Sequence, residues 1–373
     1  RMKACLVVSV AMMGCGFPRP PDVNPDAPSA GDAPAAPVCF GKIVPICFPA
    51  SAVPSAPRTL LTVENDTDLT DTGSLCDQNN DQKAAYCVVA GAGVSLPAGK
   101  TVTAHGSKPL ILLSTAAMEL LGSIDVSSHL TGGPQPRGAG ANPTDLTACV
   151  FATRAVAATM GGGGAGASFG QQGGGGGNPA GSATGGGIAG SRLDMFPAGL
   201  RGGCRGNDGS ATAGSPAAGG DGGGAVALIA AMQIQVDASI NASGGGGKGG
   251  AAGAANGGGG GSGGMIAFDS PQPLVFGANA RLWANGGSGG QGGSVTTGGA
   301  PGAESDRPNN PGSPVNVSGA GGVGADGAIG DDLGGHGGNA LGGGGGGGGG
   351  GGVGFIHAPG LTNTASISPS SSG

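Results

Sequence analysis

Short stretches with alternating apolar and polar residues recur along the chain, and one such stretch occurs in four copies. Each copy has an apolar residue, a second residue that is usually polar, and then a small or apolar residue; the copies begin at Val102, Ile124, Ile240 and Leu282. Alternation with a period of two is typical of β-strands that bury one face. Further strands precede the copies and are marked by the pairs Val94 and Leu96, Leu110 and Leu112, Met118 and Leu120, Val226 and Leu228, Ile234 and Val236, Ile266 and Phe268, and Leu274 and Phe276.

The repeated sets of strands are expected to stack on one another. The first two copies are separated by a distance typical of one coil of a β-solenoid, about 20 to 25 residues. Stacking places the four starting residues in one inward column and the residues after them in one outward column, Thr103, Asp125, Asn241 and Trp283. A second polar column, His105, Ser127, Ser243 and Asn285, is also expected to face outward. We therefore predict an all-β fold: a right-handed parallel β-helix with long glycine-rich excursions that could pack as polyglycine-II helices.

Composition and strand pattern together divide the chain into segments. We expect a lipoprotein-type signal peptide over residues 1–15 and an extended Pro/Ala-rich linker over 16–57. The N-terminal strand sets follow over 58–127 and a glycine-rich excursion over 128–224. Further strand sets with a glycine-rich insertion are expected over 225–293, a second excursion over 294–352, and a closing strand with a serine-rich tail over 353–373.

Glycine dominates the composition and restricts the core. The chain has 90 glycines among 373 residues, whereas aromatic residues make up 3% and charged residues 10%. A narrow core is therefore expected, built from the strand segments alone. Disorder is the alternative for the glycine tracts, and we expect only partial order there because glycine loses more freedom on folding than any other residue. The net charge is −6 and the basic residues are scattered, so no nucleic-acid partner is predicted.

The first residues resemble a bacterial lipoprotein signal. Lys3 precedes an apolar run that ends at Met13, and the small residue Gly14 comes directly before Cys15. The resemblance implies that Cys15 is lipidated and that the protein is exported and anchored at the outer membrane or cell surface. An ordinary secretory signal cleaved nearby is the alternative. The run is too short for a membrane-spanning helix, which needs about 20 residues.

Six cysteines follow the signal-like segment, and disulfides are expected behind an export signal. Proximity in the sequence favours three pairs: Cys39 with Cys47, Cys76 with Cys87, and Cys149 with Cys204. Metal binding is the alternative, but the sequence lacks the closely spaced cysteine and histidine motifs of a zinc site. The first pair brackets several apolar residues and is expected to form a small cap within the linker.

Acidic side chains gather in one part of the sequence. Asp66, Asp68, Asp77 and Asp81 belong to an oxygen-rich cluster of the kind that binds calcium. Their spacing differs from that of an EF-hand, so a solvated loop is the preferred interpretation. No cofactor is predicted.

Two residues are candidates for contact with a ligand. Trp283, the single tryptophan, is expected on the outer face, where its indole could stack on a sugar; packing beneath the adjacent glycine-rich segment is the preferred alternative. Asp237 is a second outward candidate. No two carboxylates occupy adjacent positions of one column, so no catalytic residue is predicted.

Two runs, residues 260–266 and 282–287, resemble the strand openings and endings of uncharacterised glycine-rich surface proteins from myxobacteria and related bacteria. The resemblance covers about residues 76–369 and implies a β-helix but no activity. We expect a non-enzymatic cell-surface lipoprotein with a structural, adhesive or interaction role. Its expected partners are the membrane, through the lipid anchor, and surface polysaccharide or another surface protein. A carbohydrate-binding or polysaccharide-degrading protein is one alternative, and an ice- or surface-binding protein is another.

Overall fold

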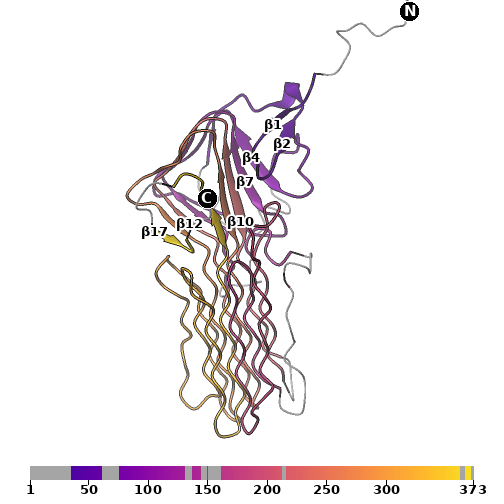
Figure 1. Cartoon of the computed structure of the whole chain (residues 1–373), viewed down its shortest axis with the longest axis vertical. Coiled ribbons are helices and arrows are strands. Elements are labelled where there is room, and N and C mark those ends of the chain that lie inside the picture. Colours follow the sequence, from indigo (N-terminus) through magenta and orange to yellow (C-terminus); the bar gives the residue numbers. More distant parts are fainter. Residues whose placement is uncertain are drawn as a thin grey trace, which may run out of the picture. The chain divides into compact units, whose positions relative to one another are not determined.

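Short strands stack into three parallel five-stranded sheets in the computed structural model (Figure 1). The structure describes residues 35–60, 75–130, 137–143, 149, 161–211, 216–361 and 366–370. All elements named below belong to the compact unit formed by residues 37–373. In the described part of the chain, no helix is long and apolar enough to cross a membrane.

Consecutive strands belong to different sheets, so each strand pairs with its counterpart in the next set. The first sheet contains β4 (Cys87–Gly91), β7 (Leu110–Ser114), β10 (Ala225–Ala230), β13 (Met265–Asp269) and β16 (Phe355–His357). The second sheet contains β3 (Arg58–Thr59), β5 (Val94–Leu96), β8 (Met118–Leu120), β11 (Ile234–Val236) and β14 (Val275–Phe276). The third sheet contains β6 (Thr101–Thr103), β9 (Ser123–Asp125), β12 (Ser239–Asn241), β15 (Arg281–Trp283) and β17 (Ser366–Ser368).

The predicted inward column is confirmed. In the third sheet Ile124 pairs with Val102 on one side and Ile240 on the other, and Ile240 pairs with Leu282. All four side chains are buried in one core with the inward residues of the other two sheets. Burial of these apolar side chains is the main favourable contribution to the stability of the stack.

The predicted fold class, a right-handed parallel β-helix, is wrong. The strands form three stacked parallel sheets and one antiparallel pair, and the glycine tracts form a body of their own beside them. The strand sets β4–β6 and β7–β9 follow each other without a long tract, whereas a tract lies between β9 and β10, between β12 and β13, and between β15 and β16. Period-two alternation determines which side chains face the core, but it does not determine how the chain travels between strand sets.

The first sheet is buried on both faces. Its strands are largely apolar, and in β7 and β10 every residue is buried. The outer face is covered by a hairpin of β1 (Val38–Phe40) and β2 (Ile46–Phe48), followed by a 3-10 turn at Ala50–Ala52, and by parts of the first glycine tract, which contribute Phe169 and Leu200. The predicted small cap is thus confirmed, and its role is to shield apolar side chains that would otherwise face water.

The described parts of the three tracts between β9 and β10, β12 and β13, and β15 and β16 form what we call the glycine bundle, whose extended segments run side by side (Figure 1). Backbone hydrogen bonds join segments far apart in the sequence and recur every third residue. The N–H groups of Gly345, Gly348 and Gly351 donate to the carbonyl oxygens of Gly293, Gly290 and Gly287, each at 2.8 Å. A three-residue repeat is the periodicity of an extended threefold helix, in which backbone groups point sideways. The described parts of the three tracts are thus held to one another by regular backbone hydrogen bonds.

The bundle depends on the absence of side chains at its contacts. A Cβ atom placed on Gly348 would lie 1.9 Å from the carbonyl oxygen of Gly258. Such a distance is far below van der Waals contact, and the obstacle is backbone that cannot rotate away. The bundle also covers the second polar column, so that His105, Ser127, Ser243 and Asn285, predicted to face outward, are all buried.

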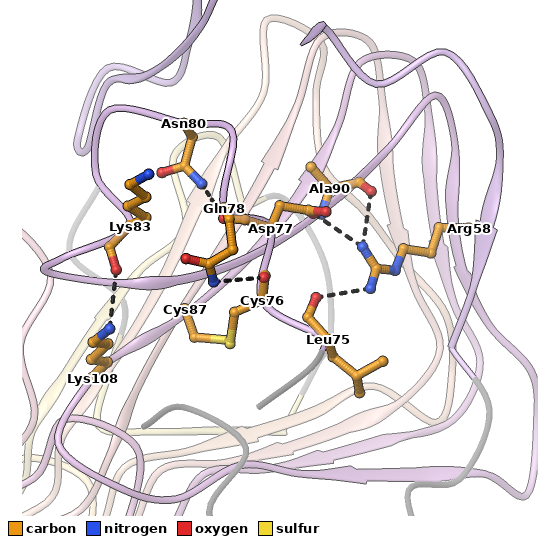
Figure 2. Close-up of a disulfide and its surroundings, with 10 residues drawn as sticks. All are labelled: Arg58, Leu75, Cys76, Asp77, Gln78, Asn80, Lys83, Cys87, Ala90 and Lys108. Carbon is orange, nitrogen blue, oxygen red and sulfur yellow. Dashed lines mark hydrogen bonds and ion pairs between the residues drawn. A yellow bond between two sulfur atoms is a disulfide. The ribbon is translucent and has the colours of Figure 1, made fainter. Parts of the chain in front are cut away.

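All three predicted disulfides are confirmed. Cys39 pairs with Cys47 across the β1–β2 hairpin, Cys76 with Cys87 at the start of β4, and Cys149 with Cys204 within the first glycine tract. Figure 2 shows the second of these with its surroundings. The pairs link residues 8, 11 and 55 positions apart, so each closes a loop of different length.

Candidate functional site

A groove of about 530 Å³ lies between the outer face of the third sheet and residues 301–306, a segment that we call the strap. The sheet contributes side chains from four neighbouring strands, β6, β9, β12 and β15. Among the lining residues are Thr101, Ser123, Asp125, Asn241, Trp283 and Glu304. A groove of this size is within the range of small-molecule sites, about 300 to 1,000 Å³.

The alternation that buries the inward column also produces the floor of the groove. Asp125, Asn241 and Trp283 each follow an inward residue directly and therefore point to the opposite face of the sheet. Parallel pairing of β9 with β12 and of β12 with β15 brings the three residues into one row. The predicted outward column is thus confirmed in register, and Asp125, Asn241 and Trp283 of this column form the floor of the groove.

An imidazole between two carboxylates closes one end of the groove. The His129 ring approaches Asp125 Oδ2 at 3.3 Å through Nε2 and Glu304 Oε2 at 2.7 Å through Nδ1. The backbone N–H of Leu130 also donates to Glu304. Glu304 belongs to the strap, so these contacts fasten the strap to the segment that follows β9.

The electrostatics of this cluster favour the charged forms. Hydrogen bonds with Asp125 and then with Glu304 raise the pKa of His129 from 6.5 to about 10, although burial opposes the change. Burial acts to raise the pKa of Asp125, but the hydrogen bond and charge of His129 and the hydrogen bonds of Ser127 together hold that pKa below its ordinary value. At neutral pH the cluster is therefore two carboxylates sharing one imidazolium, with both ring nitrogens as donors.

Trp283 is covered by the strap and not open to solvent. Its side chain is 7% exposed, and its indole N–H donates to the carbonyl oxygen of Ser305 at 3.4 Å. The Nδ2 group of Asn285 reinforces this contact by donating to Ser305 Oγ at 2.7 Å. Packing beneath the neighbouring segment, the preferred interpretation of Trp283, agrees with this geometry, while part of the residue still lines the groove.

Asp237 does not belong to the groove. Its carboxylate accepts hydrogen bonds from the backbone N–H of Asn279 at 2.7 Å and from the Asn279 side chain at 3.2 Å. These bonds hold together the turns that precede β12 and β15. The structure therefore separates the two predicted ligand contacts and gives Asp237 a structural role.

The acidic residues considered for calcium also take part in structural contacts. Asp77 forms an ion pair with Arg58 at 3.0 Å and accepts the backbone N–H of Ala90 at 2.6 Å (Figure 2), while Asp81 accepts the N–H of Cys47 at 2.8 Å. Among the residues described, no group of three or more His, Cys, Asp or Glu side chains is arranged so that it could hold a metal ion. Asp66 and Asp68, and the lipidation candidate Cys15, lie outside the described residues.

His129 and Glu304 were not among the predicted site residues. They are 175 positions apart, and neither lies in a repeated strand. The one available signal was the position of His129 four residues after Asp125, which is the last residue of β9.

The chain matches no protein-family model, no curated protein and no solved structure in the comparisons made.

Proposed function

We propose that the protein is a non-enzymatic structural or interaction protein of the cell surface, in which the glycine bundle is a rigid body displayed to the surroundings. The observation that carries this proposal is the backbone hydrogen bonding of the bundle, with contacts such as Gly348 to Gly258 that leave no room for a side chain. A body made of backbone offers few reactive groups, and its order suits mechanical or adhesive work.

The chemistry of the groove supports a role without catalysis. A general acid or base works best when its pKa lies near the working pH. Asp125 and Glu304 both bind His129, whose pKa of about 10 keeps it charged at neutral pH. The cluster is therefore suited to holding the strap in place and not to transferring protons.

We further propose that the protein is exported and attached to the outer membrane or cell surface by a lipid on Cys15, as in the glycine-rich surface proteins that the sequence resembles. The disulfides of the described region support an oxidising compartment, since such bonds are rare in the cytosol. Surface polysaccharide or another surface protein is the proposed partner.

The test is to produce the full chain in a Gram-negative host and to measure three properties: fatty-acid labelling, protease accessibility on intact cells, and attachment of the cells to surfaces and to one another. We expect Cys15→Ala to abolish labelling and surface retention. Gly348→Ala should reduce attachment, whereas Gly298→Ala, where the nearest atom to an added Cβ is 3.5 Å away, should not. Attachment equal to that of cells without the protein would refute the proposed role.

A further inference from the structure

We propose that the groove between the third sheet and the strap binds a neutral saccharide. This inference deepens the proposed function, on which it rests, by naming the chemical class of the partner. The groove combines hydrogen-bond donors, fixed acceptors and an aromatic wall in a volume suited to a small ligand, and each part can be assigned to a residue.

The donors come from the floor of the groove. Asn241 Oδ1 accepts the N–H of Ser243 at 3.0 Å, which orients the amide, and within the described chain its Nδ2 group makes no hydrogen bond. The hydroxyls of Ser239 and Ser123 form one hydrogen bond at 2.7 Å, so one of the two keeps its hydrogen for an acceptor in the groove. Thr101, which is exposed, adds a further hydroxyl at the edge.

The acceptors are the carboxylates at the end of the groove. Asp125 accepts hydrogen bonds from His129 and from the N–H and hydroxyl of Ser127, and Glu304 accepts from His129 and the N–H of Leu130, whereas a carboxylate has about four acceptor positions. The remaining positions can accept hydroxyl groups. Because His129 holds both carboxylates in place, they are oriented before a ligand arrives, which lowers the entropic cost of binding.

The apolar lining of the groove suits the C–H faces of a sugar ring. Trp283, Pro301 and Ala303 contribute carbon atoms beside the polar groups. A pyranose has the same mixture, with C–H groups on its ring faces and hydroxyl groups around its edge, and a tryptophan side chain is suited to such amphipathic contacts.

Charge argues against other small ligands. The titratable groups that line the groove are Asp125, His129, Glu304 and Asp306, so carboxylates outnumber the imidazolium. Arg307 pairs with Asp306 at 3.2 Å and neutralises part of the excess. A phosphate or carboxylate ligand would meet repulsion, and a metal ion would have to displace His129 from both of its partners.

Saccharide binding to the groove can be measured with a fluorescent residue that the chain already contains. Trp283 is the single tryptophan, so intrinsic fluorescence of the purified full-length protein monitors the groove directly. The probes are cellohexaose, chitohexaose and maltohexaose, added up to about 10 mM to detect a Kd as weak as about 1 mM. Isothermal calorimetry with the same probes provides a second measurement that does not depend on the indole.

We expect saturable binding of at least one probe, weakened about tenfold by Asn241→Ala through loss of one oriented donor. Thr101→Ala, at the exposed edge, should weaken binding less. The matched control is Asn279→Ala, which removes a polar side chain from a turn outside the groove and should leave affinity unchanged. Circular dichroism of each variant verifies folding.

Absence of saturable binding to all three probes by both methods would overturn the inference, as would equal affinity in the wild type and the folded Asn241→Ala variant. Because these measurements use purified protein, saccharide binding can fail while cell attachment persists, and attachment can fail while saccharide binding persists. The two proposals are therefore tested separately.

Discussion

The imidazole Nδ1 of His129 lies 2.7 Å from a carboxylate oxygen of Glu304, although the two residues are 175 positions apart in the chain. Together with the contact of His129 to Asp125, this pair joins the strap to the third sheet at the end of the groove. The strength of these contacts depends on the protonation of His129 and of the carboxylates. The stability of the folded protein should therefore depend on pH.

The pH dependence has a definite sign. The pKa of His129 rises from 6.5 to about 10 in the folded protein, so its stabilising contribution is complete below about pH 6.5 and is lost as pH rises toward 10. The pKa of Asp125 is lowered, so its contribution is present above the ordinary value of 3.8 and is lost as pH falls below it.

We predict that His129→Gln flattens the fall in melting temperature between about pH 6.5 and 10, measured by thermal unfolding across that range. His357→Gln, on β16 of the first sheet, is the matched control and should leave the profile as in the wild type. An unchanged profile in His129→Gln would show that the contact with Glu304 does not stabilise the fold.

Gly348→Ala should destabilise the protein severely, because the added Cβ would lie 1.9 Å from a backbone oxygen of Gly258. Overpacking of well-packed contacts costs about 1 to 3 kcal/mol and sometimes more, and we expect the upper end here. Gly298→Ala in the same bundle should change the free energy of unfolding by less than about 0.5 kcal/mol. Urea unfolding of both variants measures the difference; equal midpoints would contradict the close packing of the bundle.

The disulfides should contribute according to the loops that they close. Loop-closure entropy gives about 4 kcal/mol for Cys149–Cys204, which spans 55 positions, and about 2.5 kcal/mol for Cys39–Cys47, which spans 8. Replacing both cysteines of a pair by serine should therefore lower the melting temperature more for Cys149–Cys204 than for Cys39–Cys47. The reverse order would indicate that the Cys39–Cys47 disulfide stabilises the protein chiefly by keeping the β1–β2 hairpin packed on the first sheet.

Ile240→Ala should cost about 2 to 5 kcal/mol, because Ile240 is fully buried between Ile124 and Leu282 at the middle of the third sheet. Gln235→Ala, at an exposed position of β11, is the control and should stay within about 0.5 kcal/mol. Chemical unfolding monitored by circular dichroism provides both values, and similar losses for the two variants would contradict the inward column.

The candidate site could be predicted only in part. Alternation places Asp125, Asn241 and Trp283 on the outer face, since neighbouring residues of a strand point in opposite directions. It could not show that residues 301–306 cover Trp283 or that Glu304 reaches His129, because those contacts join segments with no shared pattern. Alternation also favours an outward position for Asp237, yet its carboxylate accepts hydrogen bonds from Asn279.

The sequence by itself determined the repeated strands and the register of their inward column, and it favoured the three disulfide pairs that the structure shows. Side-chain alternation and burial are local, repeated in each copy, and therefore visible without coordinates, as the column of Val102, Ile124 and Ile240 shows. Only the tertiary structure decided that the strands form three stacked sheets beside an ordered glycine bundle. Hydrogen bonds between identical glycine backbones leave no side-chain pattern from which the partner of Gly348 could be inferred; it is fixed by the path of the whole chain.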